Sequence, residues 1–321
     1  MNPQKNLGNK PSLSHWDFPD DAASTKTYLA ALEQLQKLFI DVQRDAFSLS
    51  EFEKFVNSLV STFQSQSWGL FRVFLDQKVF QASTASTCLN TALVCFLFAR
   101  ANAWSGENTG LLVRAALLHD IGMLFLPPSV LLKEGKLSEK ERAILESHPS
   151  VSFELVKKWG ESFEATQVAL QHHEEWNGTG YPSKAVGSKI HPWAGTVAVC
   201  LNFVARVTQR GYRNSVVGYE AVKKLIQDQN VRFQPSIVKD FVKTTGLYPP
   251  GSILLLSDGS IARVIALTHT NVMRPQIRIL IDHFGSPFRD DRGPLFELSE
   301  APKLFIARPV NLEDLFPKDV N

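Results

Sequence analysis

Cysteine, net charge and long apolar runs are all scarce in this sequence. Its 321 residues include three cysteines, Cys88, Cys95 and Cys200, which are widely spaced and form no CxxC pair. A disulfide framework or a cysteine-only zinc site is therefore not expected, and reduced thiols predict a cytoplasmic protein. The 34 Lys and Arg residues nearly balance the 32 Asp and Glu residues, for a formal net charge of +2. Such a balance creates no default attraction to DNA or to an anionic membrane.

Signals for secretion or membrane insertion are also lacking. Residues 1–24 are polar and contain no apolar core of a signal peptide. The most apolar helical stretch, residues 91–98, is far shorter than the ~20 residues that span a bilayer. We therefore expect no membrane span. A hydrophobic content of 44% in a chain of this length predicts about two folded globular domains.

Apolar residues recur at three- and four-residue steps through most of the chain, which predicts a mainly α fold. The segments Ser50–Glu53 and Ser138–Glu141 match the capping box that begins a helix. Three aliphatic runs near the C-terminus, at 252–256, 261–267 and 276–282, predict strands, with a hairpin turn over 257–260. The expected helices begin near residues 25 and 51 and continue at 68–81, 84–102, 108–121, 138–148, 151–159, 163–176, 193–209, 217–228 and 235–244.

These patterns divide the chain into four parts. We expect a disordered arm at 1–24, an N-terminal helical region at 25–80, a helical bundle domain at 81–247 and a small β-containing extension at 248–321. Residues 25–80 carry no motif that indicates an input signal.

Four of the eight histidines fall between positions 119 and 173. We expect His119-Asp120 at the end of an apolar helix, His148 at the end of the next capped helix, and the pair His172-His173 near the end of helix 163–176. Neutral imidazoles and a carboxylate are ligands of Fe, Mn, Zn or Ni, and helix ends of a bundle can bring them together. A lone histidine is more often a hydrogen-bonded core or surface residue. We favour that interpretation for the other four, His15, His191, His269 and His283.

Several motifs in a fixed order make a family resemblance specific. They are His119-Asp120-Ile121-Gly122, Pro127, Gly135-Lys136-Leu137-Ser138, His148-Pro149 and the run from His172-His173-Glu174 to Gly178-Thr179-Gly180-Tyr181-Pro182. Together they resemble the HD-GYP family, a branch of the HD metal-dependent phosphohydrolases that hydrolyses cyclic di-GMP. The resemblance extends over residues 55–285. It implies an HD-type helical bundle with a small C-terminal β appendage.

Four positions depart from the family's pattern. Thr87 stands where the family has a metal-binding His, and Ser83 stands where some members have an additional Glu ligand. Leu201 replaces a metal-binding Asp. Met123 replaces a Lys that contacts the substrate phosphate in the family.

The resemblance implies a metal centre in which one set of ligands is intact. One metal would keep only His119 and Asp120, which would also be the catalytic pair. The ligands of the other metal are Asp120, His148, His172 and His173, and all are present. We expect one divalent transition metal at most, Fe or Mn before Zn, with a metal-free protein as the alternative. A threonine hydroxyl binds such ions poorly, and leucine has no donor atom.

A nucleotide-binding site is expected beside this centre. Gly180, Tyr181 and Pro182 belong to a loop in which glycine permits close approach and tyrosine can face a base. Arg210 and Arg213 match the family's DRPYR stretch and are candidate phosphate contacts, although solvated helix-end arginines are an equally good interpretation. The resemblance also implies that this loop can contact a protein, for instance a diguanylate cyclase domain.

Two functional hypotheses remain from the sequence. The first is a degenerate HD-GYP protein of bacterial cyclic di-GMP signalling, which binds nucleotide, a protein partner or both and has weak or no phosphodiesterase activity. The alternative is an active cyclic di-GMP phosphodiesterase with an atypical metal site. We rank it second, because loss of one metal's ligands removes stabilisation of the transition state. A purely structural scaffold would leave the clustered histidines unexplained.

Overall fold

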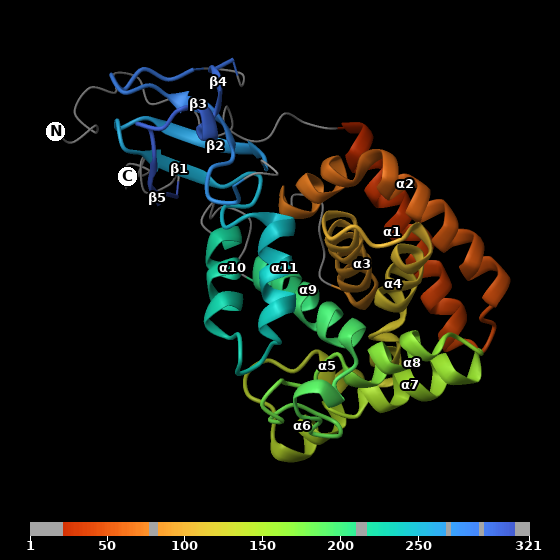
Figure 1. Cartoon of the computed structure of the whole chain (residues 1–321). Coiled ribbons are helices and arrows are strands. Elements are labelled where there is room, and N and C mark those ends of the chain that lie inside the picture. The colour runs from red at the N-terminus through yellow and green to blue at the C-terminus, as the bar shows by residue number, and fades with distance from the viewer. Residues whose placement is uncertain (1–21, 77–82, 210–216, 268–270, 289–291, 312–321) are drawn as a thin grey trace.

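The computed structural model describes residues 22–76, 83–209, 217–267, 271–288 and 292–311. They form a helical core with a small antiparallel sheet beside one end of it (Figure 1), which confirms the predicted mainly α fold. The helices are α1 (Ala22–Gln43), α2 (Leu49–Asp76), α3 (Thr84–Ala101), α4 (Gly106–Leu118), α5 (Pro128–Leu131), α6 (Glu139–Leu145), α7 (His148–Lys158), α8 (Phe163–Gln171), α9 (Pro192–Gln209), α10 (Val217–Gln227) and α11 (Pro235–Thr245), with the 3-10 helices η3 (Ile121–Phe125), η4 (Gly187–Lys189) and η5 (Leu298–Glu300).

Helix α3 lies at the centre of the helical core. It packs against α1, α2, α4, α9 and α11. By length and composition alone α3 could cross a membrane, and it is the one such candidate among the described helices. However, 78% of this apolar segment is buried inside the structure. Its apolar residues are therefore accounted for by packing against the surrounding helices.

Three helix boundaries differ from those predicted. Residues 49–76 form one continuous helix, and Ser48, not Ser50, accepts a hydrogen bond from the Glu51 amide at 3.4 Å. His148 begins α7 instead of ending the preceding helix, because the proline that follows it is suited to a first helical turn, where no amide hydrogen is needed. Helix α8 ends at Gln171, so the residues from His172 to Trp176 lie beyond its last turn. The capping box at Ser138 is confirmed.

The predicted N-terminal arm lies mostly outside the described residues. Its last residues, 22–24, already belong to α1.

The C-terminal sheet has five strands in the order β4-β3-β2-β1-β5, and all neighbours are antiparallel. The predicted hairpin is present, with Leu255 opposite Ile261. The two last strands were not predicted, because β4 has three residues and β5 includes a proline at its end. The strands are β1 (Ile253–Leu256), β2 (Ile261–Ala266), β3 (Gln276–Ile281), β4 (Leu295–Glu297) and β5 (Ile306–Pro309).

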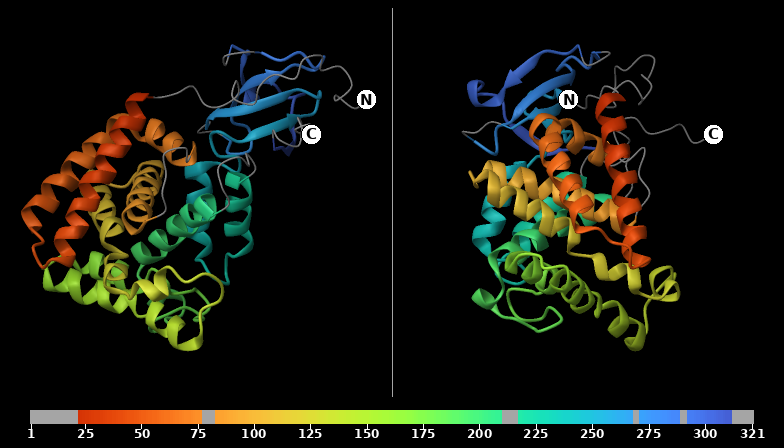
Figure 2. Two further views of the ribbon diagram at one scale, coloured as in Figure 1. Left: turned by 180° about the vertical axis from the view of Figure 1, so that it is seen from behind. Right: turned by 90° about the vertical axis from the view of Figure 1, so that its right-hand side faces the viewer.

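Two stacked tyrosines connect the sheet to the helical core. Tyr219 of α10 lies against Tyr248, with ring centroids 5.3 Å apart and an interplanar angle of 9°. Tyr248 belongs to the same apolar cluster as Leu254 and Val264 of the sheet. Figures 1 and 2 place the sheet beside the ends of α10 and α11, at the opposite end of the molecule from α5, α6 and α7.

Candidate metal centre

The chain presents His119 and Asp120 at the end of the buried helix α4. His119 is the C-cap residue and is fully buried, and Asp120 begins the turn into η3 with 9% exposure. Gly122 then lets η3 lie directly against α7. A Cβ atom there would be 2.2 Å from the His148 carbonyl oxygen, and the Gly122 amide donates to Ser152 Oγ at 2.8 Å. This close approach places Asp120 next to His148.

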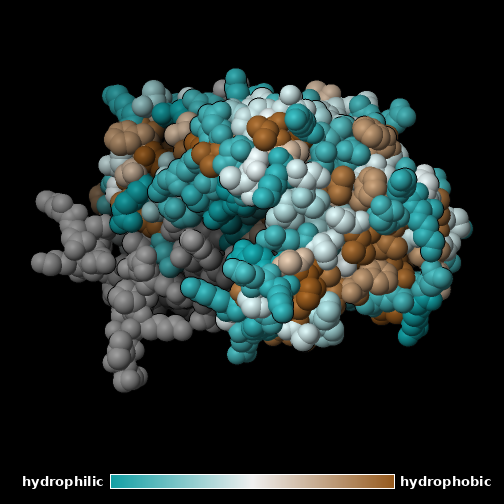
Figure 3. All heavy atoms as spheres, turned by 90° about the horizontal axis from the view of Figure 1, so that it is seen from below, coloured by the Kyte–Doolittle hydropathy of each residue, from teal (hydrophilic) through white to brown (hydrophobic). Residues whose placement is uncertain are grey.

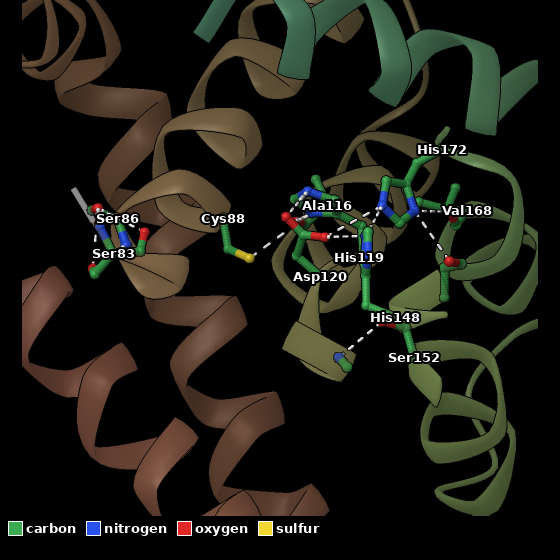
Figure 4. Close-up of polar contacts among 12 residues, drawn as sticks. Ser83, Ser86, Cys88, Ala116, His119, Asp120, His148, Ser152, Val168 and His172 are labelled. Carbon is green, nitrogen blue, oxygen red and sulfur yellow. Dashed lines mark hydrogen bonds and ion pairs between the residues drawn. The ribbon is translucent and has the colours of Figure 1, made fainter. Parts of the chain in front are cut away.

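Main-chain carbonyl groups orient three of the imidazoles, and Figure 4 shows this for His119 and His172. The Nδ1 atom of His119 is 2.7 Å from Ala116 O, that of His148 is 2.6 Å from Leu145 O, and that of His172 is 3.0 Å from Ala169 O. A carbonyl oxygen can only accept, so each Nδ1 carries the proton and donates. In a neutral imidazole the Nε2 lone pair is then free to bind a metal.

The free nitrogen atoms converge on the Asp120 carboxylate. Asp120 Oδ1 is 3.0 Å from His148 Nε2 and 3.3 Å from His172 Nε2, and the two nitrogens are 3.3 Å apart. One ligand atom from each of four residues lies within 4.8 Å of the others; the four are Asp120, His148, His172 and His173. Ligands bonded at ~2.1 Å to one ion lie roughly 3.0–3.4 Å apart in octahedral or tetrahedral geometry. The spacing therefore fits a divalent transition metal.

His119 lies outside this four-residue group, on the other side of the carboxylate. Its Nε2 is 3.3 Å from Asp120 Oδ2, and this fully buried nitrogen has no hydrogen bond of acceptable geometry. Asp120 therefore directs one oxygen to the four-residue group and the other to His119. On the far side of the His119 ring, Cys88 Sγ lies 3.9 Å from Nδ1.

Electrostatics keep Asp120, His172 and His173 in the protonation states that a metal requires. Burial raises the pKa of Asp120, but the neighbouring imidazoles, with His119 first, outweigh it and hold that pKa well below its usual range. Burial lowers the pKa of His172 to about 4 and that of His173 well below 6.5. For His119, burial also lowers the pKa, but the Asp120 charge outweighs it and the net direction is upward. An ionised carboxylate beside neutral His172 and His173 is the ligand state at neutral pH.

The loop after His173 forms a wall of the centre. The Tyr181 ring stacks on His173 with centroids 4.8 Å apart and lies 6.2 Å from the His148 ring. Burial raises the pKa of Tyr181, so its phenol is neutral. Gly180 is required here, because a Cβ atom would be 2.3 Å from the Glu175 amide nitrogen. Pro182 follows Tyr181 through a cis peptide bond.

Two glutamates that had no predicted role hold this loop. Glu174 is 3% exposed and accepts hydrogen bonds from the amides of Ser183 at 2.7 Å and Ala185 at 2.9 Å. Glu175 pairs with Arg232 at 2.6 Å. Position next to the histidine pair is a signal that could have indicated Glu174. Arg232 is 57 residues away from its partner and has no such local signal.

The four altered positions lie on α3 or at its N-cap, on η3 and on α9. Ser83 is the N-cap of α3, where it accepts from the Ser86 amide in a capping box, and Figure 4 shows this pair apart from the histidines. Thr87 is half-buried one turn further along α3. Leu201, 8% exposed, belongs to α9, and Met123 is half-buried in η3. The candidate phosphate contacts Arg210 and Arg213 lie outside the described residues.

Fold and site together define a helical protein with a His/Asp centre suited to a divalent metal. A family model described as an HD domain matches residues 74–237, about half of the chain, and one described as a KOW domain associated with HD domain matches residues 253–318. The chain belongs to the HD domain family, within its HD-GYP branch.

Named relatives support this assignment. A cyclic di-GMP phosphodiesterase of Pseudomonas aeruginosa is 31% identical over 166 residues, which are 51% of this chain and 40% of that protein. A cyclic di-GMP phosphodiesterase response regulator of Xanthomonas campestris is 36% identical over 136 residues, 42% of this chain and 36% of that protein. The matches thus span less than half of each relative. An HDG"Y"P protein from Bdellovibrio bacteriovorus has the same fold, with a TM-score of 0.55 at 17% identity over 71% of this chain and 74% of that chain.

Proposed function

We propose that this chain is a degenerate HD-GYP protein of bacterial cyclic di-GMP signalling. It binds a cyclic dinucleotide, a protein partner or both, and its phosphodiesterase activity is weak or absent. One observation carries the proposal: Asp120 Oδ1 lies beside His148 and His172 in a four-residue group of possible metal ligands, whereas among the described residues His119 is the one side chain paired with Oδ2. The names of the relatives support the choice of cyclic di-GMP as ligand.

The intact half of the centre supports binding of one divalent metal by Asp120, His148, His172 and His173. Three imidazole nitrogens and one carboxylate oxygen suit Fe or Mn, and also accept Zn. Such an ion lowers the pKa of a water molecule and neutralises charge on phosphate oxygens. Around it, Tyr181 forms the wall against which a base can stack, and Gly180 lets the ligand approach the backbone.

The incomplete half of the centre supports weak or absent catalysis. His119 and Asp120 Oδ2 are two donors, which rarely retain an ion. Leu201 contributes none, and Met123 brings no positive charge to a phosphate. Stabilisation of charge in the transition state is therefore smaller than in a two-metal centre.

The location and the partner are part of the same proposal. Three buried, free cysteines support the cytoplasm, where thiols stay reduced. A diguanylate cyclase domain or another signalling protein is the proposed macromolecular partner, in contact with the Gly180–Pro182 loop. Arg210 and Arg213 remain proposed phosphate contacts.

A metal and turnover measurement tests the proposal. The purified protein is loaded with Fe, Mn or Zn, dialysed and measured for metal per chain and for cyclic di-GMP hydrolysis. We expect about one ion per chain, little turnover, and loss of the ion in Asp120→Asn. The surface variant Asp45→Asn, whose side chain is 94% exposed, is the matched control and keeps the ion. Turnover at rates typical of enzymes, ~1 s⁻¹ or faster, would contradict the proposal.

A restored variant tests the same idea in the opposite direction. Thr87→His, Leu201→Asp and Met123→Lys together supply two donors and one positive charge. We expect the triple variant to bind additional metal and to gain phosphodiesterase activity. Unchanged metal content in a folded triple variant would mean that these positions do not face His119.

The alternative, an active phosphodiesterase with an atypical site, is favoured by one observation. The four-ligand group is complete, and in it an ionised Asp120 lies beside neutral His172 and His173 at neutral pH. Turnover that is lost in Asp120→Asn and retained in Asp45→Asn would support it.

A further inference from the structure

The last turn of α6 lies directly beside the metal centre. The carbonyl group of Leu145 accepts the hydrogen bond that orients His148, at 2.6 Å. The His148 ring in turn lies 6.2 Å from Tyr181. The C-terminal end of α6 therefore lies next to His148, on the side of the centre that faces Tyr181. This helix lies on the lower face of the molecule in Figure 1, and that face is largely hydrophilic with separate apolar patches (Figure 3).

Arg142, on the last turn of α6, forms a loose and exposed ion pair. Its guanidinium is 3.9 Å from the Glu146 carboxylate, and the two side chains are 67% and 37% exposed. An exposed pair at this distance contributes little stability, so the guanidinium can change partner at small cost. Burial is the largest influence on the pKa of Tyr181, but Glu146 raises and Arg142 lowers it through their charges. Arg142 and Glu146 are therefore among the charged side chains near Tyr181.

Two other described cations form hydrogen bonds to a carboxylate that are shorter than the ion pair of Arg142. Arg232 also acts on Tyr181, but its Nε donates to Glu175 at 2.6 Å. Lys133 donates to Glu141 at 2.5 Å. Among these three described cations, Arg142 has the most weakly held charge.

We propose that Arg142 supplies the positive charge that Met123 does not. Its guanidinium leaves Glu146 and forms paired hydrogen bonds with a phosphodiester group of a cyclic dinucleotide at the metal centre. The planar guanidinium fork matches two phosphate oxygens, which an ammonium group cannot do. This inference rests on the proposed function, because it names a contact to the ligand of that same site.

Glu146 has the opposite effect in this arrangement. Its carboxylate holds Arg142 in the free protein and repels an incoming phosphate. Removing its charge therefore releases the guanidinium, and the benefit depends on Arg142 being present.

Calorimetric titration of cyclic di-GMP into the Mn-loaded protein tests the inference. We expect Arg142→Ala to raise the Kd roughly 10- to 100-fold, as loss of a charge-assisted hydrogen bond does, and Arg142→Lys to raise it less. Lys140→Ala is the matched control, because Lys140 is an exposed cation on the same helix about 200° away from Arg142. It should leave the Kd within about twofold. Metal per chain and thermal stability should be the same in all of these variants.

A double-mutant cycle separates a phosphate contact from a general effect on folding. Glu146→Gln should lower the Kd a few-fold in the wild-type background and not in Arg142→Ala. If the wild type binds cyclic di-GMP and Arg142→Ala binds it as Lys140→Ala does, the inference is overturned and the proposed function stands. If the metal-loaded wild type binds no cyclic di-GMP, nucleotide binding and this inference fail together.

Discussion

Three imidazoles at the metal centre are oriented by main-chain carbonyl groups at the ends of helices. Each of the three Nδ1 atoms described above finds its acceptor three or four residues earlier in the chain. Free carbonyl groups of this kind are a property of helix ends, where the intrahelical ladder stops. The orientation of the ligands therefore depends on where helices end more than on neighbouring side chains.

Burial of uncharged imidazoles predicts that the metal-free protein is destabilised by mild acid. The pKa of His172 falls from 6.5 to about 4 on folding, so below pH 6.5 the unfolded chain binds more protons than the folded one. The stability that goes with a neutral His172 is present above pH 6.5 and is lost as pH falls toward 4. The lowered pKa of His173 acts in the same direction. Urea unfolding should show a loss of ~1–3 kcal/mol between pH 6.5 and 4.5.

Two histidine variants check which groups cause this dependence of the unfolding free energy on pH, which is the slope of stability against pH. His172→Gln should flatten it, whereas His283→Gln, which changes an exposed histidine in the sheet region, should leave it intact. The raised pKa of His119 acts mainly above pH 6.5, where the unfolded chain loses that proton and the folded chain keeps it, so it does not cancel the loss between pH 6.5 and 4.5. An unchanged slope in His172→Gln would contradict the assignment.

The candidate ligand residues could be selected from the sequence, because they fall in contiguous motifs, and the structure brings Asp120, His148, His172 and His173 together. The family resemblance also implied that Asp120 is shared between His119 and the other histidines, but it did not indicate which carboxylate oxygen faces each side. Likewise, the pair of Glu175 with Arg232 joins segments whose proximity arises only in the folded chain.

At the scale of elements, helix α3 begins at a serine where the family resemblance suggested a lost ligand. Ser83 accepts from the Ser86 amide at 3.1 Å, and the Ser86 hydroxyl accepts from the Ser83 amide at 2.8 Å. This position therefore serves the start of the central helix rather than the metal centre.

A cap at Ser83 predicts a specific pattern of stability. Ser83→Ala should lower the free energy of unfolding by ~1 kcal/mol, whereas Ser83→Asp should retain most of it, because aspartate is also a good N-cap. Chemical denaturation measures both. Metal per chain should not change in either variant, and a loss of metal in Ser83→Ala would indicate a ligand role instead.

Elements with strong periodicity could be predicted, and their junctions could not. The apolar pattern placed α3, α4, α9 and α11 within a few residues of their observed bounds. The first residues of α7 were assigned to the preceding helix, because a proline after His148 looked like a stop signal although it is equally suited to a first turn. The strands β4 and β5 are too short for alternation to be visible.

At the scale of the whole molecule, the sheet lies at the opposite end from α6 and α7, and α7 begins with His148 of the metal centre (Figure 1). The connection at the sheet end includes the stack of Tyr219 on Tyr248, with Gly218 beside Pro249. A Cβ atom at Gly218 would already be 3.4 Å from Pro249. The two segments are therefore in close contact at the base of the sheet.

This arrangement predicts that the sheet can be loosened without loss of the metal. Tyr248 is 8% exposed, and Tyr248→Ala removes its ring from the cluster that contains Leu254 and Val264. Truncation of a large buried ring costs roughly 3–5 kcal/mol. We expect faster amide hydrogen exchange in residues 253–281, with metal per chain and exchange in α8 unchanged.

An exposed aromatic residue of the same region provides the comparison. Phe284 is 75% exposed, so Phe284→Ala should leave exchange in the strands as it is in the wild type. Loss of metal in Tyr248→Ala would mean that the helical core does not hold its ligands independently of the sheet. Retention of metal together with rapid exchange in β1 to β3 would instead establish that the His/Asp centre is supported by the helices, because the ends of α4, α6 and α8 supply the carbonyl groups that orient three of the imidazoles.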